Sequence, residues 1–111
     1  MFKNLFSRTP GTTDVDLETF AKAVNANEVS VVDVREPHEF AAGHIPGASN
    51  LPLSCFEVAK LPTSLPVVLI CQAGGRSRKA LDQARAAGRA DVRHYPGGMS
   101  QWRTHGGNVT L

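Results

Sequence analysis

Cys71 is the residue whose setting in the sequence is best suited to chemistry. It follows a short apolar run at residues 67–70 and precedes a glycine-containing turn, after which residues 76–87 have the composition of a helix. The sulfur is therefore expected where a buried strand ends and a helix begins. Free backbone amides and the positive end of the helix dipole stabilise an anion at such a place. We expect Cys71 to ionise more readily than an ordinary cysteine.

The loop after Cys71 is the predicted anion-binding element. It consists of Gln72, Ala73, Gly74, Gly75, Arg76 and Ser77. Its amides are expected to curl around the sulfur, where they would stabilise a thiolate, a persulfide anion or a bound oxyanion. Glycines in the loop allow close approach because no Cβ stands in the way. No histidine lies next to Cys71 in the sequence, and a thiolate that is stabilised by amides needs no adjacent base.

Charge is distributed unevenly along the 111 residues. Residues 1–66 hold five Lys and Arg against eight Asp and Glu, whereas residues 67–111 hold seven Lys and Arg against two Asp. The positive half contains Cys71, which predicts an electropositive mouth that attracts small anions. The net charge of only +2 gives no support for a nucleic-acid partner. No apolar run is long enough for a membrane span, so no membrane association is predicted either.

The remaining candidate ligands do not indicate a metal site or a cofactor. The two cysteines, Cys55 and Cys71, lack metal-ligand spacing, and Cys55 is predicted to be a structural or exposed thiol. Four histidines are too scattered for a metal site: His38, His44, His94 and His105. A disulfide between the two cysteines would disable Cys71, and no signal peptide is recognisable, so we expect a cytoplasmic location.

The order of predicted elements indicates an α/β fold. Short β-type segments occur at residues 29–34, 49–51, 67–70 and 92–95, and residues 14–16 form either a brief edge strand or the N-cap of the next helix. One helical segment begins at Leu17, and others are predicted at residues 36–42, 54–61, 76–87 and 99–104. Strands that alternate with helices pair in parallel and are covered on both faces, and ligands bind at their carboxyl ends. Cys71 stands at one of those ends.

The chain length favours one domain. We expect a loose leader at residues 1–12, a single domain at residues 13–107 and a tail at residues 108–111. Within the domain, Asp33 falls inside an apolar strand segment and needs partners, because an unpaired buried charge is costly. Trp102 is expected in the core.

Four segments together resemble the rhodanese family of sulfurtransferases. The loop at residues 71–77 looks like the active-site loop of that family, and residues 31–36 and 44–48 resemble its two upstream signatures. Residues 95–99 with Trp102 resemble its C-terminal segment. The resemblance runs from about residue 14 to residue 106 and is closest to the single-domain members.

This resemblance implies a small, mostly parallel sheet of five strands with helices on both faces. It also implies a double displacement, in which the Cys71 thiolate takes a sulfane sulfur from an anionic donor such as thiosulfate and becomes a persulfide. Cyanide or a cellular thiol then removes that sulfur. The family signature further implies that His44 braces its connector. Four residues separate Cys71 from Arg76, whereas the related dual-specificity phosphatases have one more, which favours sulfur over phosphorus.

Two questions stay open at this point. Arg76 either meets the substrate anion or pairs with an acid such as Glu36 or Asp33. The chain is either a sulfurtransferase or a carrier and interaction module that accepts persulfide from a sulfur-relay protein and turns over little thiosulfate. A phosphatase or arsenate reductase on the same fold is a further alternative.

Overall fold

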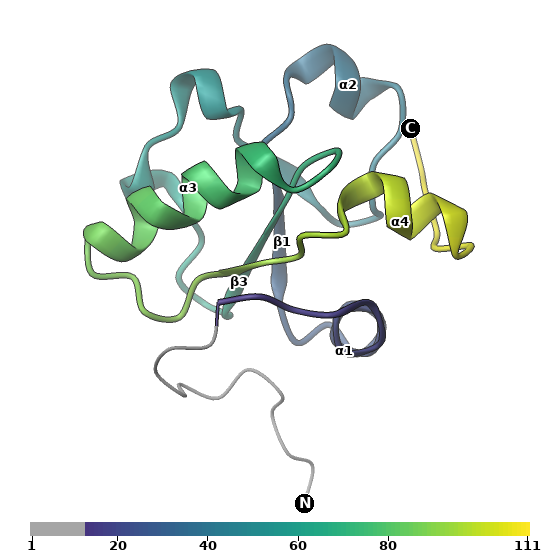
Figure 1. The fold of residues 1–111 in the computed structure, drawn as a ribbon, viewed down its shortest axis with the longest axis horizontal. Helices are drawn as coiled ribbons and strands as arrows, with labels where there is room; N and C mark the ends of the chain where they lie inside the picture. Colours follow the sequence, from purple (N-terminus) through teal and green to yellow (C-terminus); the bar gives the residue numbers. More distant parts are fainter. Residues whose placement is uncertain (1–12) are drawn as a thin grey trace, which may run out of the picture.

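The computed structural model describes residues 13–111, so the predicted leader lies outside the described residues. Within them the chain forms a parallel sheet with the strand order β2-β1-β3-β4 (Figure 1). The strands are β1 (Ser30–Asp33), β2 (Ser49–Asn50), β3 (Val67–Ile70) and β4 (Arg93–His94). β1 and β3 form the centre, with Ser30 opposite Val67 and Asp33 opposite Ile70. The predicted α/β class and parallel pairing are confirmed.

The expected fifth strand is absent from the described residues. The sequence allows either an edge strand or a helix cap at residues 14–16, and the structure has the cap. The Asp16 carboxylate accepts a 2.8 Å hydrogen bond from the Thr19 amide, and helix α1 (Leu17–Asn25) begins at the next residue. Because the backbone turns into the helix there, only Asp14 pairs with the sheet, through a single parallel bridge to His94.

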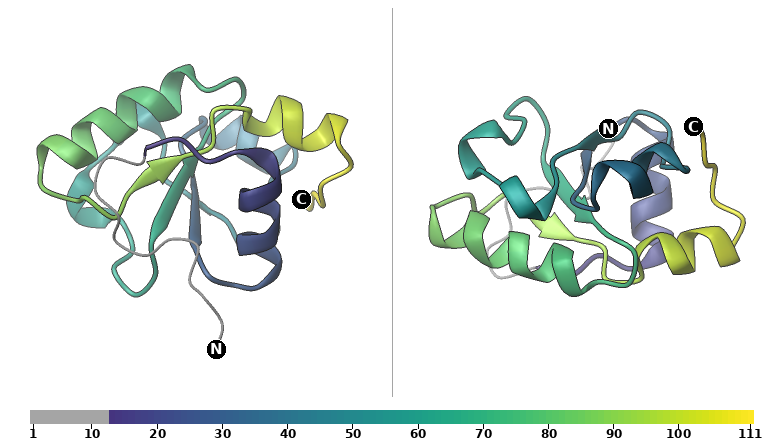
Figure 2. Two further views of the ribbon diagram at one scale, coloured as in Figure 1. Left: turned by 60° about the horizontal axis from the view of Figure 1, so that its bottom comes forward. Right: turned by 90° about the horizontal axis from the view of Figure 1, so that it is seen from above.

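Helices cover both faces of the sheet, as predicted. Figures 1 and 2 show α1 and α4 on one side of the strands and α3 on the other, together with two 3-10 turns. The bounds of these elements are α3 (Gly75–Ala86), α4 (Gly98–Thr104), η1 (Leu53–Cys55) and η2 (Val58–Lys60). A short helix, α2 (Pro37–Ala41), lies above the carboxyl ends of the strands (Figure 1).

The side chains of β3 point alternately to the two faces of the sheet and contribute to two separate layers of the core. Val68 and Ile70 pack in the cluster that contains α1 and α4, whereas Val67 and Leu69 pack in the cluster that contains α3. All four side chains are fully buried, because each face of the strand has its own helical cover. Trp102 is buried in the first cluster, as predicted.

Residues 54–61 form two 3-10 turns instead of the weak helix that was expected. Pro52 and Pro62 bracket this stretch, and within it the chain makes only i→i+3 turns at Leu53–Cys55 and Val58–Lys60. Ser54 does not cap a helix, since its hydroxyl donates instead to Glu36 Oε1 at 2.8 Å. η1 and η2 still pack Leu53 and Val58 against the α3 side of the core.

Residues 108–111 lie on the domain. His44 and Thr110 exchange two backbone hydrogen bonds of 2.8 Å, and the Trp102 indole donates to the Asn108 carbonyl at 2.8 Å. These contacts join the C-terminal segment to the connector that follows α2.

Among the described helices, none combines the length and apolar character that crossing a membrane requires.

Candidate active site

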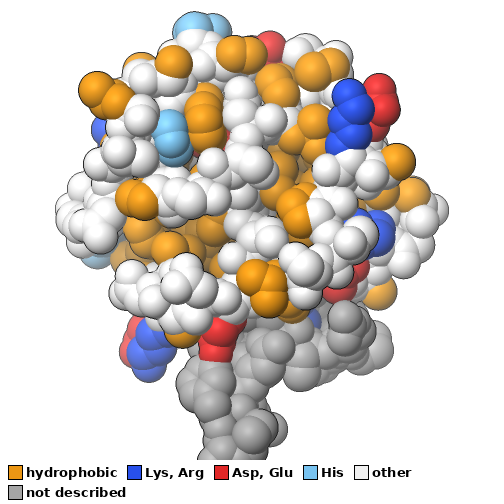
Figure 3. Space-filling view, turned by 180° about the vertical axis from the view of Figure 1, so that it is seen from behind, with side chains coloured by type: hydrophobic (Ala, Val, Ile, Leu, Met, Phe, Trp, Pro, Cys, Tyr) orange, Lys and Arg blue, Asp and Glu red, His pale blue; other side chains and the backbone are white. Residues whose placement is uncertain are grey.

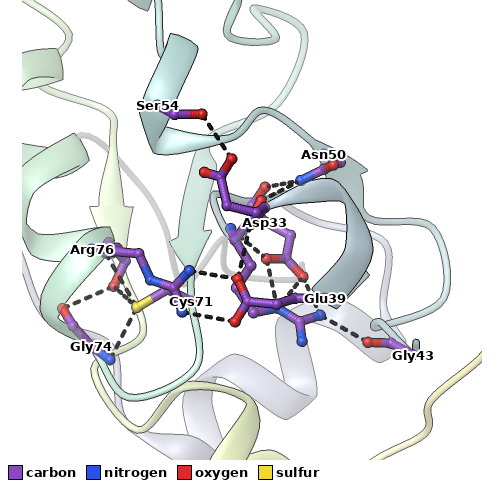
Figure 4. A network of polar contacts seen from close by, with 11 residues as sticks. Asp33, Glu39, Gly43, Asn50, Ser54, Cys71, Gly74 and Arg76 are labelled. Atoms are coloured by element: carbon purple, nitrogen blue, oxygen red, sulfur yellow. Dashed lines mark hydrogen bonds and ion pairs between the residues drawn. The ribbon is translucent and has the colours of Figure 1, made fainter. Parts of the chain in front are cut away.

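Cys71 lies at the carboxyl end of β3, in the loop that leads into α3. Its Sγ accepts hydrogen bonds from the amides of Gly74 and Ser77 at 3.1 and 3.3 Å (Figure 4). The Ala73 amide also contributes, and the Ser77 hydroxyl lies 3.5 Å from the sulfur. The sulfur is therefore surrounded by groups that stabilise negative charge.

Two opposing effects act on the ionisation of Cys71. Burial raises the pKa of the thiol, because the residue is only 1% exposed. Hydrogen bonding with Ser77, through its hydroxyl and its amide, and with the amides of Ala73 and Gly74 lowers it. Together these contacts outweigh burial, so the pKa of Cys71 is lowered. The same exclusion of water strengthens each amide dipole that faces the sulfur.

The shape of the loop depends on Gly74. This residue is the N-cap of α3 and has φ of +99°, in the left-handed region that favours glycine. A Cβ there would lie 2.6 Å from the Pro96 carbonyl oxygen. The corner before α4 thus packs directly under the loop, and the Met99 amide donates to the Cys71 carbonyl at 2.9 Å. Glycine is needed both for the backbone turn and for this close contact.

The predicted loop residues do not all face the sulfur. Gly74 and Ser77 donate their amides to it, and Ser77 is fully buried. Gln72, Ala73 and Gly75 expose their surfaces to solvent. The carbonyl of Gln72 is fixed by the Ser100 amide at 3.1 Å.

Arg76 pairs with an acid that the sequence did not single out. Its guanidinium donates to both carboxylate oxygens of Glu39 on α2, at 2.6 and 3.0 Å (Figure 4). The suggested partners, Glu36 and Asp33, were therefore wrong. The Arg76 side chain is 34% exposed and that of Glu39 is 26% exposed. Hydrogen bonding from Arg76 lowers the pKa of Glu39 to about 2.

Asp33 has the partners that its buried position requires. Its carboxylate accepts hydrogen bonds from Nε and Nη2 of Arg35, the latter at 2.7 Å. Both side chains are at most 3% exposed. Arg35 Nη2 also donates to the Gly43 carbonyl at 2.8 Å, while the Asn50 side chain donates to the carbonyls of Asp33 and Arg35 at 2.9 Å. This network ties β1, β2 and the connector together (Figure 4).

His44 braces the connector, as the sequence resemblance implied. Its Nδ1 lies 2.8 Å from the Phe40 carbonyl oxygen, and its ring stacks on the Phe40 ring with a centroid distance of 3.7 Å. His44 therefore connects α2 to the start of the following segment.

In residues 13–111 no group of three or more acidic, cysteine and histidine residues could hold a metal ion.

Sequence reasoning missed two residues that reach Cys71 through Ser77. His94 Nδ1 lies 2.9 Å from the Ser77 hydroxyl oxygen, and His94 Nε2 lies 3.3 Å from Asp14 Oδ1. His94 was considered only as a potential metal ligand. His94 comes close to the loop because β4 pairs with β3, which places His94 beside Leu69. That register is a property of the folded sheet.

A hollow lies apart from Cys71. It has a volume of about 540 Å³ between α1 and the C-terminal segment, and its lining includes Leu17, Ala21 and Trp102. Figure 3 shows the side of the molecule turned away from the viewer of Figure 1, where uncharged side chains predominate and charged ones gather at the margins. None of residues 71–77 lines this hollow.

The comparisons with known proteins agree with this arrangement. A family model for the rhodanese-like domain matches residues 16–105. An uncharacterized protein of Synechocystis sp. is 37% identical over 90% of this chain, although the match spans only 57% of that protein. The thiosulfate:glutathione sulfurtransferase of Saccharomyces cerevisiae is 32% identical, with 72% of this chain and 68% of that protein covered.

A solved structure shows the same fold. The human single-domain sulfurtransferase TSTD1 is 31% identical and superposes with a TM-score of 0.72. The match covers 85% of this chain and 97% of the human one.

Proposed function

This chain belongs to the rhodanese-like domain family, and on that premise we propose that it is a sulfurtransferase in which Cys71 carries the transferred sulfur as a persulfide. The observation that carries this proposal is the set of amides that donate to Sγ from Gly74 and Ser77. These donors lower the pKa of Cys71 and so favour the thiolate, the form of cysteine that acts as a nucleophile.

The first half-reaction loads the sulfur. The Cys71 thiolate attacks the outer, sulfane sulfur of thiosulfate, the S–S bond of thiosulfate breaks, and sulfite leaves with the bonding electron pair. The product is a persulfide whose charge lies on its outer sulfur. Amides from Ala73, Gly74 and Ser77 are preorganised for an anion and need little rearrangement when that charge shifts.

The second half-reaction unloads it. Cyanide or a thiol attacks the outer sulfur, the persulfide S–S bond breaks, and Cys71 leaves as a thiolate that the same amides stabilise. The products are thiocyanate or a new persulfide. The name of the yeast relative supports thiosulfate as the donor and a small thiol as the acceptor. Because Cys71 must be reduced to react, a reducing compartment such as the cytoplasm suits this cycle.

Arg76 is assigned a positioning role in this proposal. Its guanidinium is occupied by both oxygens of Glu39, which anchors the loop to α2. The negative charge of Cys71 also raises the pKa of Arg76, so the two groups attract each other across the loop. Arg76 therefore holds the loop against α2 and does not need to contact the donor directly.

The test is intact-mass measurement after incubation with thiosulfate. We expect a gain of one sulfur atom that is lost on addition of cyanide, with thiocyanate released in equal amount. Cys71→Ser is expected to abolish both the gain and the turnover, whereas Cys55→Ser, which changes an exposed thiol, serves as the matched control and retains them. Sulfur uptake by the Cys71→Ser variant would overturn the assignment.

The same experiment separates the alternatives. Persulfide formation from a donor protein, with very little from thiosulfate, would favour a carrier module. Turnover of an aryl phosphate without sulfur uptake would favour a phosphatase. Either result would leave the fold assignment in place and replace the proposed reaction.

A further inference from the structure

A continuous line of polar contacts leads from Cys71 to the surface. The sulfur lies 3.5 Å from the Ser77 hydroxyl, this hydroxyl lies 2.9 Å from His94 Nδ1, and His94 Nε2 lies 3.3 Å from the Asp14 carboxylate. Ser77 is fully buried and His94 is 3% exposed, so water cannot readily replace these partners. The line joins the loop, β4 and the segment before α1.

Ser77 has one hydroxyl proton and several neighbours that can accept it. They are the Cys71 sulfur, the Gly74 carbonyl at 3.2 Å and His94 Nδ1. The Asp14 carboxylate favours a proton on Nε2 of His94, which makes Nδ1 of a neutral imidazole an acceptor. The Ser77 proton then points to His94, and Ser77 can only accept a hydrogen bond from the Cys71 thiol.

Building on the function proposed for Cys71, we propose that His94 is a positioning residue that promotes ionisation of Cys71 by taking up its proton through Ser77. The thiol proton passes from Sγ to the Ser77 oxygen, while the hydroxyl proton of Ser77 passes to His94 Nδ1. Ser77 ends neutral, with its remaining O–H bond directed at the thiolate. His94 ends as an imidazolium that donates to Ser77 and to Asp14, and no proton is gained or lost overall.

The surroundings of His94 act on its proton affinity in opposite directions. Burial lowers the pKa of His94, and the positive charge of Arg78 acts in the same direction. The carboxylates of Asp14 and Asp82 raise it. A neutral imidazole is free to accept the proton, and Asp14 then stabilises the cation. Arg76, the nearest cation to Cys71, is already paired with Glu39.

The experiment titrates Cys71 directly in a Cys55→Ser background. The ultraviolet absorbance of the thiolate is followed against pH, and a Cys55→Ser, Cys71→Ser protein supplies the baseline. His94→Asn keeps a hydrogen-bonding group near Ser77 but cannot store a proton. We expect it to raise the pKa of Cys71 by about one unit, a roughly tenfold loss of thiolate below that pKa. This readout needs no sulfur donor, so it is independent of whether thiosulfate is the substrate.

Further variants distinguish a proton path from a packing effect. His105→Asn changes an exposed histidine on the end of α4 and is expected to leave the titration unchanged. Asp14→Asn is expected to shift the pKa of Cys71 in the same direction as His94→Asn, but less. In a Ser77→Ala protein, where the path is broken, His94→Asn is expected to have no additional effect on the titration.

A measurement on the Cys55→Ser protein itself guards against misfolded variants. The nitrogen NMR signals of the His94 ring are expected to show the proton on Nε2 while Cys71 is a thiol. A titration of Cys71 that is identical in the His94→Asn protein would overturn the proposal. A neutral His94 protonated on Nδ1 would overturn it as well, because Nδ1 could then accept nothing from Ser77.

Discussion

β1 and β3 run side by side and end at the same edge of the sheet, yet they manage negative charge in different ways. β1 ends at Asp33, whose carboxylate is matched by the Arg35 guanidinium in a buried ion pair of 2.7 Å. β3 ends beside Cys71, whose sulfur is met by the neutral amides of Gly74 and Ser77. Figure 4 shows the two sites next to each other.

The difference separates structure from reactivity. A guanidinium that binds both oxygens of a carboxylate neutralises its charge within a fixed, bidentate geometry. Amide dipoles stabilise a charge without cancelling it, so the sulfur keeps its nucleophilic electron pair. The ion pair at the end of β1 is therefore structural, whereas the sulfur at the end of β3 keeps the electron pair that the proposed reaction requires. The nearby cation that could have neutralised Cys71, Arg76, is bound to Glu39 instead.

The largest expected effect comes from breaking the pair at the end of β1. Arg35→Met leaves the Asp33 carboxylate buried without its counter-charge, which is expected to destabilise the protein by about 3–5 kcal/mol. Urea unfolding at neutral pH measures this loss. Lys60→Met, which removes an exposed ion pair with Glu57, is the matched control and is expected to change the free energy of unfolding by less than about 0.5 kcal/mol.

A double variant sharpens the same test. Adding Asp33→Asn to Arg35→Met removes the unpaired charge, so part of the lost stability is expected to return. If Arg35→Met alone costs no more than the Lys60 control, the pair at the end of β1 is not the structural element described above.

The second effect concerns the loop at the end of β3. Gly74→Ala places a Cβ against the Pro96 carbonyl oxygen and forces φ of +99° on an L-residue. We expect a loss of about 1–3 kcal/mol in stability. If one amide hydrogen bond to the thiolate is lost, that removes about 1.5–3 kcal/mol, or roughly tenfold to hundredfold, from the rate of persulfide formation. Rates of sulfur uptake and urea unfolding are measured together.

Gly75→Ala is the matched control for this loop. A Cβ at Gly75 meets nothing within 4 Å, and the residue is exposed at the first turn of α3. We expect activity close to that of the unaltered protein. Equal activity of the Gly74→Ala protein would mean that the amides around Cys71 are not the source of its reactivity.

The smallest expected effect concerns the partly exposed ion pair between Glu39 and Arg76, which lies between the ends of β1 and β3. The pKa of Glu39 is lowered to about 2 in the folded protein from an ordinary value near 4.5, so the unfolded chain binds the proton more readily. The stabilisation is therefore fully present above about pH 4.5 and is lost as the pH falls toward 2. Solvent screening reduces it to about 1 kcal/mol.

Glu39→Gln tests this contribution. The difference in the free energy of unfolding between the original protein and the variant is expected to shrink as the pH falls through that window. Glu57→Gln, at an exposed site, is expected to show a much weaker pH dependence. A Glu39→Gln difference that stays constant from pH 6 to about pH 2 would contradict the role given to the pair.

Much of the fold was readable because its signals are local. The apolar run at Val67–Ile70 matched β3 residue for residue, and Asp16 capped α1 as one of the two alternatives proposed for it. The prediction failed where two local structures compete for the same residues. The fifth strand lost to the helix cap at Asp16, and the weak helix at residues 54–61 became two 3-10 turns between prolines.

The sequence by itself determined where Cys71 stands, because a strand, a glycine turn and a helix follow one another in the chain and bring their own amides to its sulfur. Tertiary structure decided which side chains join it. Glu39 and His94 reach the loop from α2 and β4, through parallel pairing and helix packing between segments far apart in sequence. Hydrogen bonds within a turn depend on neighbouring residues, whereas those between elements depend on register and packing, which composition and spacing do not encode.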